Sequence, residues 1–136
     1  MAELTVRAEL PALAAIADFL AETLAGCGDE LVFAIQLAVD EACSNTILYG
    51  YPGGEAGTIT IACTVDDDTV RVTITDNGVP FDPLTAPVPS LDVPAEERPI
   101  GGLGVHFIRT VTDSVTYARE GERNVLSMEK KRPASP

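Results

Sequence analysis

A proline-rich segment between Val79 and Ile100 places the strongest limit on how this chain can fold. Six of the ten prolines in the sequence lie in it: Pro80, Pro83, Pro87, Pro89, Pro94 and Pro99. Because proline lacks a backbone N–H and fixes φ, neither a helix interior nor a central strand tolerates this density. Loops this long inside compact domains are usually functional, and patterned sequence resumes directly after this one. Residues 79–100 are therefore predicted to form a lid.

Hydrophobic patterning on both sides of the predicted lid indicates short strands and helices. The predicted elements are, in chain order, a strand over 3–9, helices over 12–24 and 29–49, strands over 58–65 and 70–76, a short helix over 103–111, and strands over 115–117 and 124–128. Asp29 is the expected N-cap of the second helix. Hairpins with helices grouped between them predict an α+β fold, a two-layer sandwich whose mixed, largely antiparallel sheet is covered by helices on one face.

Length and composition fit one folded domain. The chain has 136 residues, of which 46% are hydrophobic and 22% charged, as in single soluble domains. We expect one domain over 1–132, followed by a short tail over 133–136. No uninterrupted apolar stretch reaches the ~18–20 residues of a membrane span, and the first residues do not resemble a secretion signal. Three cysteines without metal-ligand spacing argue against a disulfide framework. A cytoplasmic protein is therefore predicted.

The charge is strongly acidic and unevenly distributed. Nine basic and 21 acidic residues give a net charge of −12, and residues 1–97 contain only two bases, Arg7 and Arg71. Such a surface repels nucleic acid and anionic lipid, because phosphate binding requires clustered lysine and arginine. The only lysines are Lys130 and Lys131. A nucleotide site in this chain would therefore use a metal ion, backbone N–H groups or arginine in place of a P-loop lysine.

Two polar residues project into the apolar face of the second predicted helix. At ~100° per residue, Glu41 and Asn45 lie one turn apart inside the arc of apolar side chains. A carboxylate buried without a partner is costly, so we interpret the pair as aimed into a cavity. The alternative is a helix edge, where Glu41 reaches water and Asn45 caps a neighbouring loop.

A third polar residue, Asp76, points to the core side of its predicted strand. It shares its parity with the apolar residues from Val70 to Ile74. The Asn77-Gly78 pair that follows is also a common hairpin turn. That alternative is weakened because a proline-rich segment follows instead of a strand. An inward carboxylate at a strand end can accept a hydrogen bond from a ligand amine.

Glycines open the short helix predicted after the lid. Gly101, Gly102 and Gly104 let the backbone approach a ligand, and a helix start offers free N–H groups to an anion. Arg98 lies just before this cluster. His106, the only histidine, lies inside the helix and is interpreted as structural.

The order of these features resembles the N, G1 and G2 boxes of the GHKL (Bergerat) ATP-binding fold, which histidine kinases, gyrase and MutL share. Residues 40–45 (DEACSN) and 97–105 (ERPIGGLGV) are most similar to the bacterial anti-sigma factor serine/threonine kinases. These are the partner-switching kinases of sporulation and general stress control. The resemblance extends from the first strand to Lys131.

The resemblance implies a role for each residue singled out above. Asn45 would be the side-chain ligand of Mg²⁺ and Glu41 the general base. Asp76 would accept the exocyclic amine of adenine, with Gly78 allowing the base to approach. Arg98 would meet the terminal phosphate. The start of the phosphate-binding helix would be formed by Gly101, Gly102, Leu103 and Gly104.

One position departs from the family pattern. The family often begins its last strand with Gly-Thr, where this chain has Arg123-Asn124. Any contact from that strand to the nucleotide is therefore an open point.

The implied function is a Mg²⁺- and ATP-dependent kinase that phosphorylates a serine or threonine on an antagonist with a STAS domain. The same protein would bind a sigma factor or another regulator, as a monomer or a homodimer. The alternative is a non-catalytic module whose partner affinity depends on the bound nucleotide, and Glu41 favours the kinase because a pure binder needs no base. A histidine kinase would need a phosphoacceptor helix, and a GHKL ATPase a transducer domain.

Overall fold

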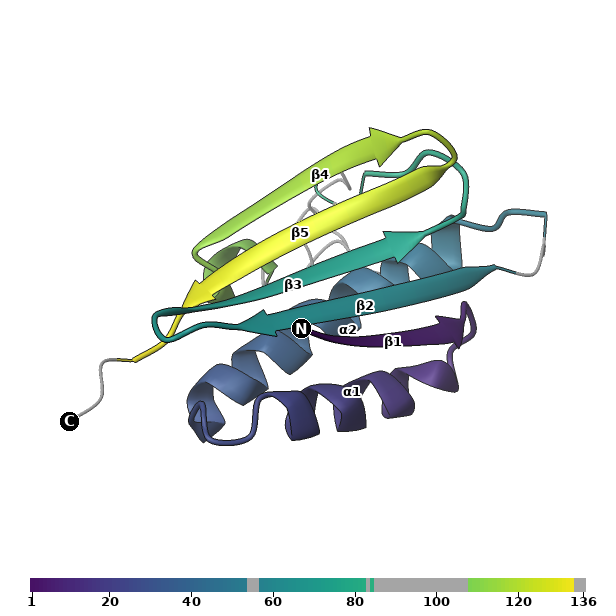
Figure 1. Cartoon of the computed structure of the whole chain (residues 1–136). Coiled ribbons are helices and arrows are strands. Elements are labelled where there is room, and N and C mark those ends of the chain that lie inside the picture. Colours follow the sequence, from purple (N-terminus) through teal and green to yellow (C-terminus); the bar gives the residue numbers. More distant parts are fainter. Residues whose placement is uncertain (54–56, 83, 85–107, 134–136) are drawn as a thin grey trace, which may run out of the picture.

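The computed structural model describes residues 1–53, 57–82, 84 and 108–133, in which helices pack on one face of a five-stranded sheet (Figure 1). The strands are β1 (Ala2–Arg7), β2 (Thr58–Val65), β3 (Thr69–Asp76), β4 (Ser114–Glu120) and β5 (Arg123–Lys131). Their order across the sheet is β1-β2-β3-β5-β4, and every described pairing is antiparallel. The predicted α+β sandwich is confirmed.

The two long helices follow each other between β1 and β2. They are α1 (Ala12–Thr23) and α2 (Asp29–Tyr49), close to the predicted bounds. The prediction that Asp29 is the N-cap of α2 was wrong by one residue. Gly28 holds the N-cap position with a φ of 99°, which glycine adopts without strain, and Asp29 and Glu30 lie in the first turn, where they complement the helix dipole.

The core lies between α1, α2 and the inner face of the sheet. Strict alternation buries every second residue of β2 and β3, as their sequence pattern predicts. The buried apolar residues include Ile16, Leu20, Leu31, Ile35, Val39, Ile59, Ile61, Val70, Val72 and Ile74. In the described part of the chain, α2 alone is long and apolar enough to suit a membrane span, and 44% of that window is buried inside the fold. Core packing accounts for its hydropathy.

Most of the predicted lid and the glycine-rich helix start lie outside the described residues. Of the lid, the structure describes residues 79–82 and 84. Residues 108–111 are helical, which agrees with the end of the short helix predicted over 103–111. The strands β4 and β5 are longer than predicted, because their exposed outer residues extend beyond the apolar positions that marked them.

Candidate functional site

Asn45 is a buried amide in the C-terminal half of α2. It is 1% exposed, and neither its Oδ1 nor its Nδ2 atom has a hydrogen-bond partner among the residues that the structure describes. Leaving a buried polar group unsatisfied costs about 1–3 kcal/mol. The low exposure of Asn45 confirms its predicted position on the apolar face of the helix. A polar side chain kept at this cost is a candidate ligand-binding group.

Glu41 lies one turn before Asn45 on the same helix and is half-buried. Burial raises the pKa of its carboxyl above the ordinary value of 4.5, and the negative charge of neighbouring Asp40 raises it further. A carboxyl in such surroundings holds its proton more readily than one in water. Glu41 is therefore a stronger base than an ordinary glutamate, which suits it to accept a proton during a reaction.

Asp76 ends β3 with its carboxylate on the inner face of the sheet, as its parity predicts. It is 6% exposed. Its Oδ1 atom accepts hydrogen bonds from the backbone N–H of Gly78 at 2.9 Å and from Nδ2 of Asn124 at 3.0 Å. One carboxylate oxygen is thus fully engaged within the protein, and the orientation of the group is fixed.

The electrostatics show that Asp76 lies close to α2 and to the chain directly after it. The pKa of the buried Cys43 thiol, on α2, is raised by burial and then by the carboxylates of Asp40 and Asp76. Burial, followed by the charge of Asp76, raises the pKa of Tyr51 to about 12. The charge of Asp76 therefore acts both on Cys43 of α2 and on Tyr51, directly after this helix.

Gly78 lies against the end of α2. A Cβ atom on Gly78 would stand 2.5 Å from the carbonyl oxygen of Gly50, and the backbone N–H of Val79 donates to that same oxygen at 2.9 Å. Close backbone packing therefore requires a glycine here, independently of any ligand. The role of Gly78 in admitting a base stays a prediction.

The Asn77-Gly78 pair does not form a hairpin turn. The neighbour of β3 beyond this point is β5, far along the sequence, not the segment that follows directly. Asn77 instead uses its Oδ1 atom to accept hydrogen bonds from the backbone N–H of Thr58 at 3.0 Å and from the hydroxyl of Tyr51 at 2.9 Å. These bonds tie the chain after β3 to the start of β2.

Asn124 was not predicted as a site residue, yet it lies directly opposite Asp76 in the β3–β5 pairing. It is 4% exposed, and its amide donates to the Asp76 carboxylate. The signal that could have found it is strand parity, because Asn124 shares its parity with the buried Leu126 and Met128. An inward polar residue at a strand end is the same pattern that identified Asp76.

The remaining predicted site residues lie outside the described residues. They are Arg98, Gly101, Gly102, Leu103 and Gly104. Of the four described site residues, Glu41 and Asn45 lie one turn apart on α2, Asp76 ends β3, and Gly78 lies against the end of α2.

The described residues fit a magnesium ion held mainly by a nucleotide rather than by a protein cage. Within the described ranges, no group of three or more His, Cys, Asp and Glu side chains could hold a metal. Mg²⁺ commonly binds one or two protein oxygens together with water and substrate phosphates. The Oδ1 atom of Asn45, which accepts no hydrogen bond from the described part of the chain, is an oxygen of this kind.

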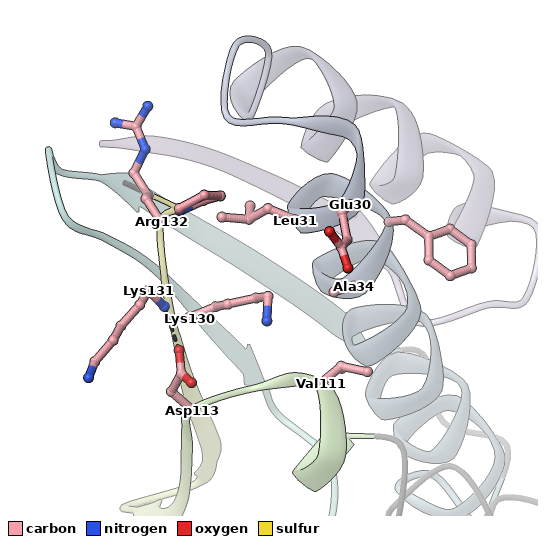
Figure 2. Close-up of a pocket in the computed structure, with 10 residues that line it drawn as sticks. Glu30, Leu31, Ala34, Val111, Asp113, Lys130, Lys131 and Arg132 are labelled. Carbon is pink, nitrogen blue, oxygen red and sulfur yellow. Dashed lines mark hydrogen bonds between the residues drawn. The ribbon is translucent and has the colours of Figure 1, made fainter. Parts of the chain in front are cut away.

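Cavities lined by described residues lie at both ends of the sheet. The smaller, of about 400 Å³, borders the site and is lined by Gly50, Tyr51, Asn77, Gly78, Val79, Pro80, Arg119 and Glu122. The larger, of about 580 Å³, lies between the start of α2 and the end of β5, where Glu30 and Lys130 both point into it (Figure 2). None of the predicted site residues lines the larger cavity. Its mixed charges, which include Asp113, match no single class of ligand.

Comparison with known proteins agrees with this geometry. Residues 6–130 match the family described as histidine kinase-like ATPase domain. The chain is 30% identical over 131 residues to a serine-protein kinase RsbW of Bacillus cereus, covering 89% of this chain and 81% of the relative. It is 35% identical over 108 residues to the serine-protein kinase RsbW of Listeria monocytogenes, covering 76% and 69%.

Solved structures share the fold. One contains the RsbU and RsbW domains of a Mycobacterium tuberculosis protein, with a TM-score of 0.67 and 18% identity over 98% of this chain and 34% of that one. Another is the histidine kinase domain of a blue-light activated histidine kinase from Erythrobacter litoralis, with a TM-score of 0.57 and 17% identity over 87% and 58%.

These matches define the class of protein as an ATP-binding domain of the histidine kinase-like type. Within that class, the chain belongs to the RsbW-like anti-sigma factor serine-protein kinase family. The resemblance found in the sequence is thus confirmed, and nucleotide use and kinase activity hold at the level of the family.

Proposed function

We propose that this protein is a Mg²⁺- and ATP-dependent serine/threonine kinase that acts in the cytoplasm as an anti-sigma, partner-switching regulator. The observation that carries the proposal is the buried amide of Asn45, which lies one turn from Glu41 and has no hydrogen-bond partner among the described residues. A structural polar pair would have its hydrogen bonds satisfied within the protein. An amide kept ready for a ligand beside a carboxyl with a raised pKa suits a reactive site.

The adenine base would be recognised at the end of β3. Because Oδ1 of Asp76 already accepts two hydrogen bonds, Oδ2 is the oxygen proposed to accept the exocyclic amine of adenine. Gly78, which has no side chain, would leave the base room beside this carboxylate. An acceptor-only carboxylate favours an amino group over a carbonyl at this position of the purine.

The phosphates would lie between α2 and the predicted lid, residues 79–100. Asn45 would supply the protein's side-chain ligand to Mg²⁺, which when bound neutralises charge on the phosphates. The glycine-rich helix start over 101–104 would offer backbone N–H groups to the phosphates. Arg98 would meet the terminal phosphate. The roles of these last residues rest on the family resemblance.

Glu41 would act as the general base for phosphate transfer. Its carboxylate would accept the proton of a serine or threonine hydroxyl as the hydroxyl oxygen attacks the terminal phosphate of ATP. The phosphate–ADP bond breaks in the same step. General-base catalysis typically contributes 10²–10⁴-fold to a rate.

The proposed substrate is an antagonist protein with a STAS domain, and the proposed second partner is a sigma factor or another regulator. The support is the similarity to proteins named serine-protein kinase RsbW. The acidic net charge of −12 supports a protein partner over nucleic acid. Phosphorylation of the antagonist would release it and leave the kinase free to hold its other partner.

The test is single-turnover phosphate transfer from γ-labelled ATP to a STAS-domain protein encoded by the same organism. Glu41→Gln should lower the transfer rate by about 10²–10⁴-fold while ATP affinity changes little. Asp40→Asn is the matched control, because it removes the adjacent, exposed carboxylate and should transfer at a near wild-type rate. Transfer by Glu41→Gln at the wild-type rate would exclude Glu41 as the base. ATP binding without transfer by the wild type would favour a non-catalytic module.

A further inference from the structure

Asn124 and Asp76 face each other across the β3–β5 pairing, on the inner side of the sheet. Both side chains are buried, with exposed fractions of 4% and 6%. The Nδ2 group of Asn124 donates to Oδ1 of Asp76 at 3.0 Å and to the carbonyl oxygen of Val79 at 2.8 Å. Both amide hydrogens are therefore committed to acceptors within the protein.

The carbonyl end of the Asn124 amide is committed as well. Its Oδ1 atom accepts hydrogen bonds from the backbone N–H of Phe81 at 3.2 Å, from the hydroxyl of Tyr117, and from the guanidinium of Arg119 at 3.2 Å. A flipped amide would set two N–H groups against these donors. The network therefore fixes which end of the side chain faces Asp76.

We infer that Asn124 is a positioning residue for the carboxylate of Asp76, an inference that rests on the proposed adenine contact. With its donors and its acceptor committed, Asn124 has no group left for a nucleotide. It acts by supplying a fixed donor to Oδ1, which holds Asp76 as an acceptor and directs Oδ2 toward the ligand. On this inference, the contact of the last strand with the base, which the sequence left open, is an indirect one through Asp76.

The same amide joins this carboxylate to the beginning of the predicted lid. Val79 and Phe81 are the first and third residues of the segment 79–100, and both are held by Asn124 through their backbone atoms. Arg119 adds a hydrogen bond to the carbonyl oxygen of Gly78 at 2.8 Å. The Asn124 side chain on β5 thus holds both Asp76, the proposed base acceptor, and the start of the segment that follows it.

The experiment compares ATP with purine riboside 5′-triphosphate, which lacks the exocyclic amine, at constant Mg²⁺. In Asn124→Leu, which keeps the size but removes the amide, ATP affinity should fall about tenfold, as for loss of one charge-assisted hydrogen bond. Affinity for the amine-free nucleotide should stay near wild type. Asn124→Thr keeps one hydroxyl donor and should retain part of the preference for ATP. Ser127→Ala, on the outer face of the same strand, is the control and should change neither affinity.

Four outcomes would overturn the inference. Equal losses for both nucleotides in Asn124→Leu and Asn124→Thr would show general damage to the pocket. If Asn124→Leu lowers ATP affinity in the Asp76→Asn background as much as it does in the wild type, Asn124 does not act through the carboxylate. A wild-type protein that binds both nucleotides equally would overturn the proposed adenine contact itself, and this inference with it. Wild-type ATP affinity and full wild-type ATP preference in Asn124→Leu would overturn this inference alone.

Discussion

The carbonyl oxygen of Gly50 occupies the space that a side chain on Gly78 would need, 2.5 Å from the position of its Cβ. Gly50 caps the end of α2 and Gly78 follows β3, so at this point the helix with the proposed catalytic groups and the strand with the proposed base acceptor meet through backbone atoms. Neither glycine has a side chain that could move to relieve this contact. This contact therefore limits how closely the end of α2 and the end of β3 can approach each other.

Gly78→Ala should force the two backbones apart and weaken both the fold and the site. We expect a loss of about 1–3 kcal/mol in the free energy of unfolding, as for overpacking at a close contact. ATP affinity should fall in the same variant. Gly26→Ala is the control: Gly26 has a φ of 91° but nothing within 4 Å of an added Cβ, so it should lose stability without losing affinity. Urea unfolding and calorimetric titration measure the two effects, and unchanged values in Gly78→Ala would contradict the contact.

Asn45→Leu should separate stability from binding. The substitution replaces a buried amide that lacks partners in the described structure by an apolar group of similar size, and leucine also favours helix. The nucleotide-free variant should therefore unfold at a higher urea concentration than the wild type. ATP binding in the presence of Mg²⁺ should be lost, because the proposed metal ligand is gone. A variant that is less stable, or that still binds ATP in a Mg²⁺-dependent way, would contradict this assignment.

Asp76→Asn should weaken ATP binding by roughly tenfold or more, since a charge-assisted hydrogen bond contributes about 1.5–3 kcal/mol. The amide can also present a donor to the ligand, so the preference for ATP over GTP should shrink. Titration of both nucleotides against the folded variant measures this ratio. Unchanged ATP affinity would reduce Asp76 to a structural role at the end of β3.

The pH dependence of phosphate transfer should report Glu41. Its pKa is raised above 4.5, so the carboxylate required of a base is lost as the pH falls through that raised value. The transfer rate should therefore decline on the acidic side at a higher pH than for an ordinary glutamate. Asp40→Asn removes the neighbouring charge and should move this decline to lower pH. In Glu41→Gln the residual rate should lack the acidic decline, and an unchanged profile would assign it to another group.

The contribution of Glu41 to stability should change with pH in the opposite direction to its contribution to the transfer rate. A folded-state pKa above the unfolded one means that the protonated form is favoured in the fold. The contribution of Glu41 to stability is therefore fully present below pH 4.5 and is lost as the pH rises through its raised pKa. Glu41→Gln should consequently be more stable than the wild type at neutral pH and similar at acidic pH. Unfolding midpoints at the two pH values test this sign.

The elements that the sequence predicts best are those whose pattern is local. Strict alternation from Thr58 to Val65 matched β2, and the buried parity of Asp76 followed from three apolar neighbours on its own strand. The burial of Asn45 followed in the same way from helical periodicity. Each of these required only the spacing of residues within one element.

The contacts that the sequence did not predict are those that depend on register between distant strands. Asn124 could be placed on an inner face, but its pairing with Asp76 depends on the alignment of β5 with β3 across a separation of 48 residues. The reason for Gly78 is likewise a neighbour at the end of α2, which no local pattern reveals. Tertiary contact decides both, so only the fold could identify them.

The place of β3 inside the sheet has a consequence for hydrogen exchange. This strand is paired with β2 over residues 70–76 and with β5 over residues 69–76, so neither of its edges is open. Amide hydrogens on such a strand exchange mainly when the whole domain opens, unlike those of the edge strands β1 and β4. Asp76 is carried by this strand up to its last residue. The proposed selectivity for adenine should therefore persist through local fraying and be lost on global unfolding of the domain.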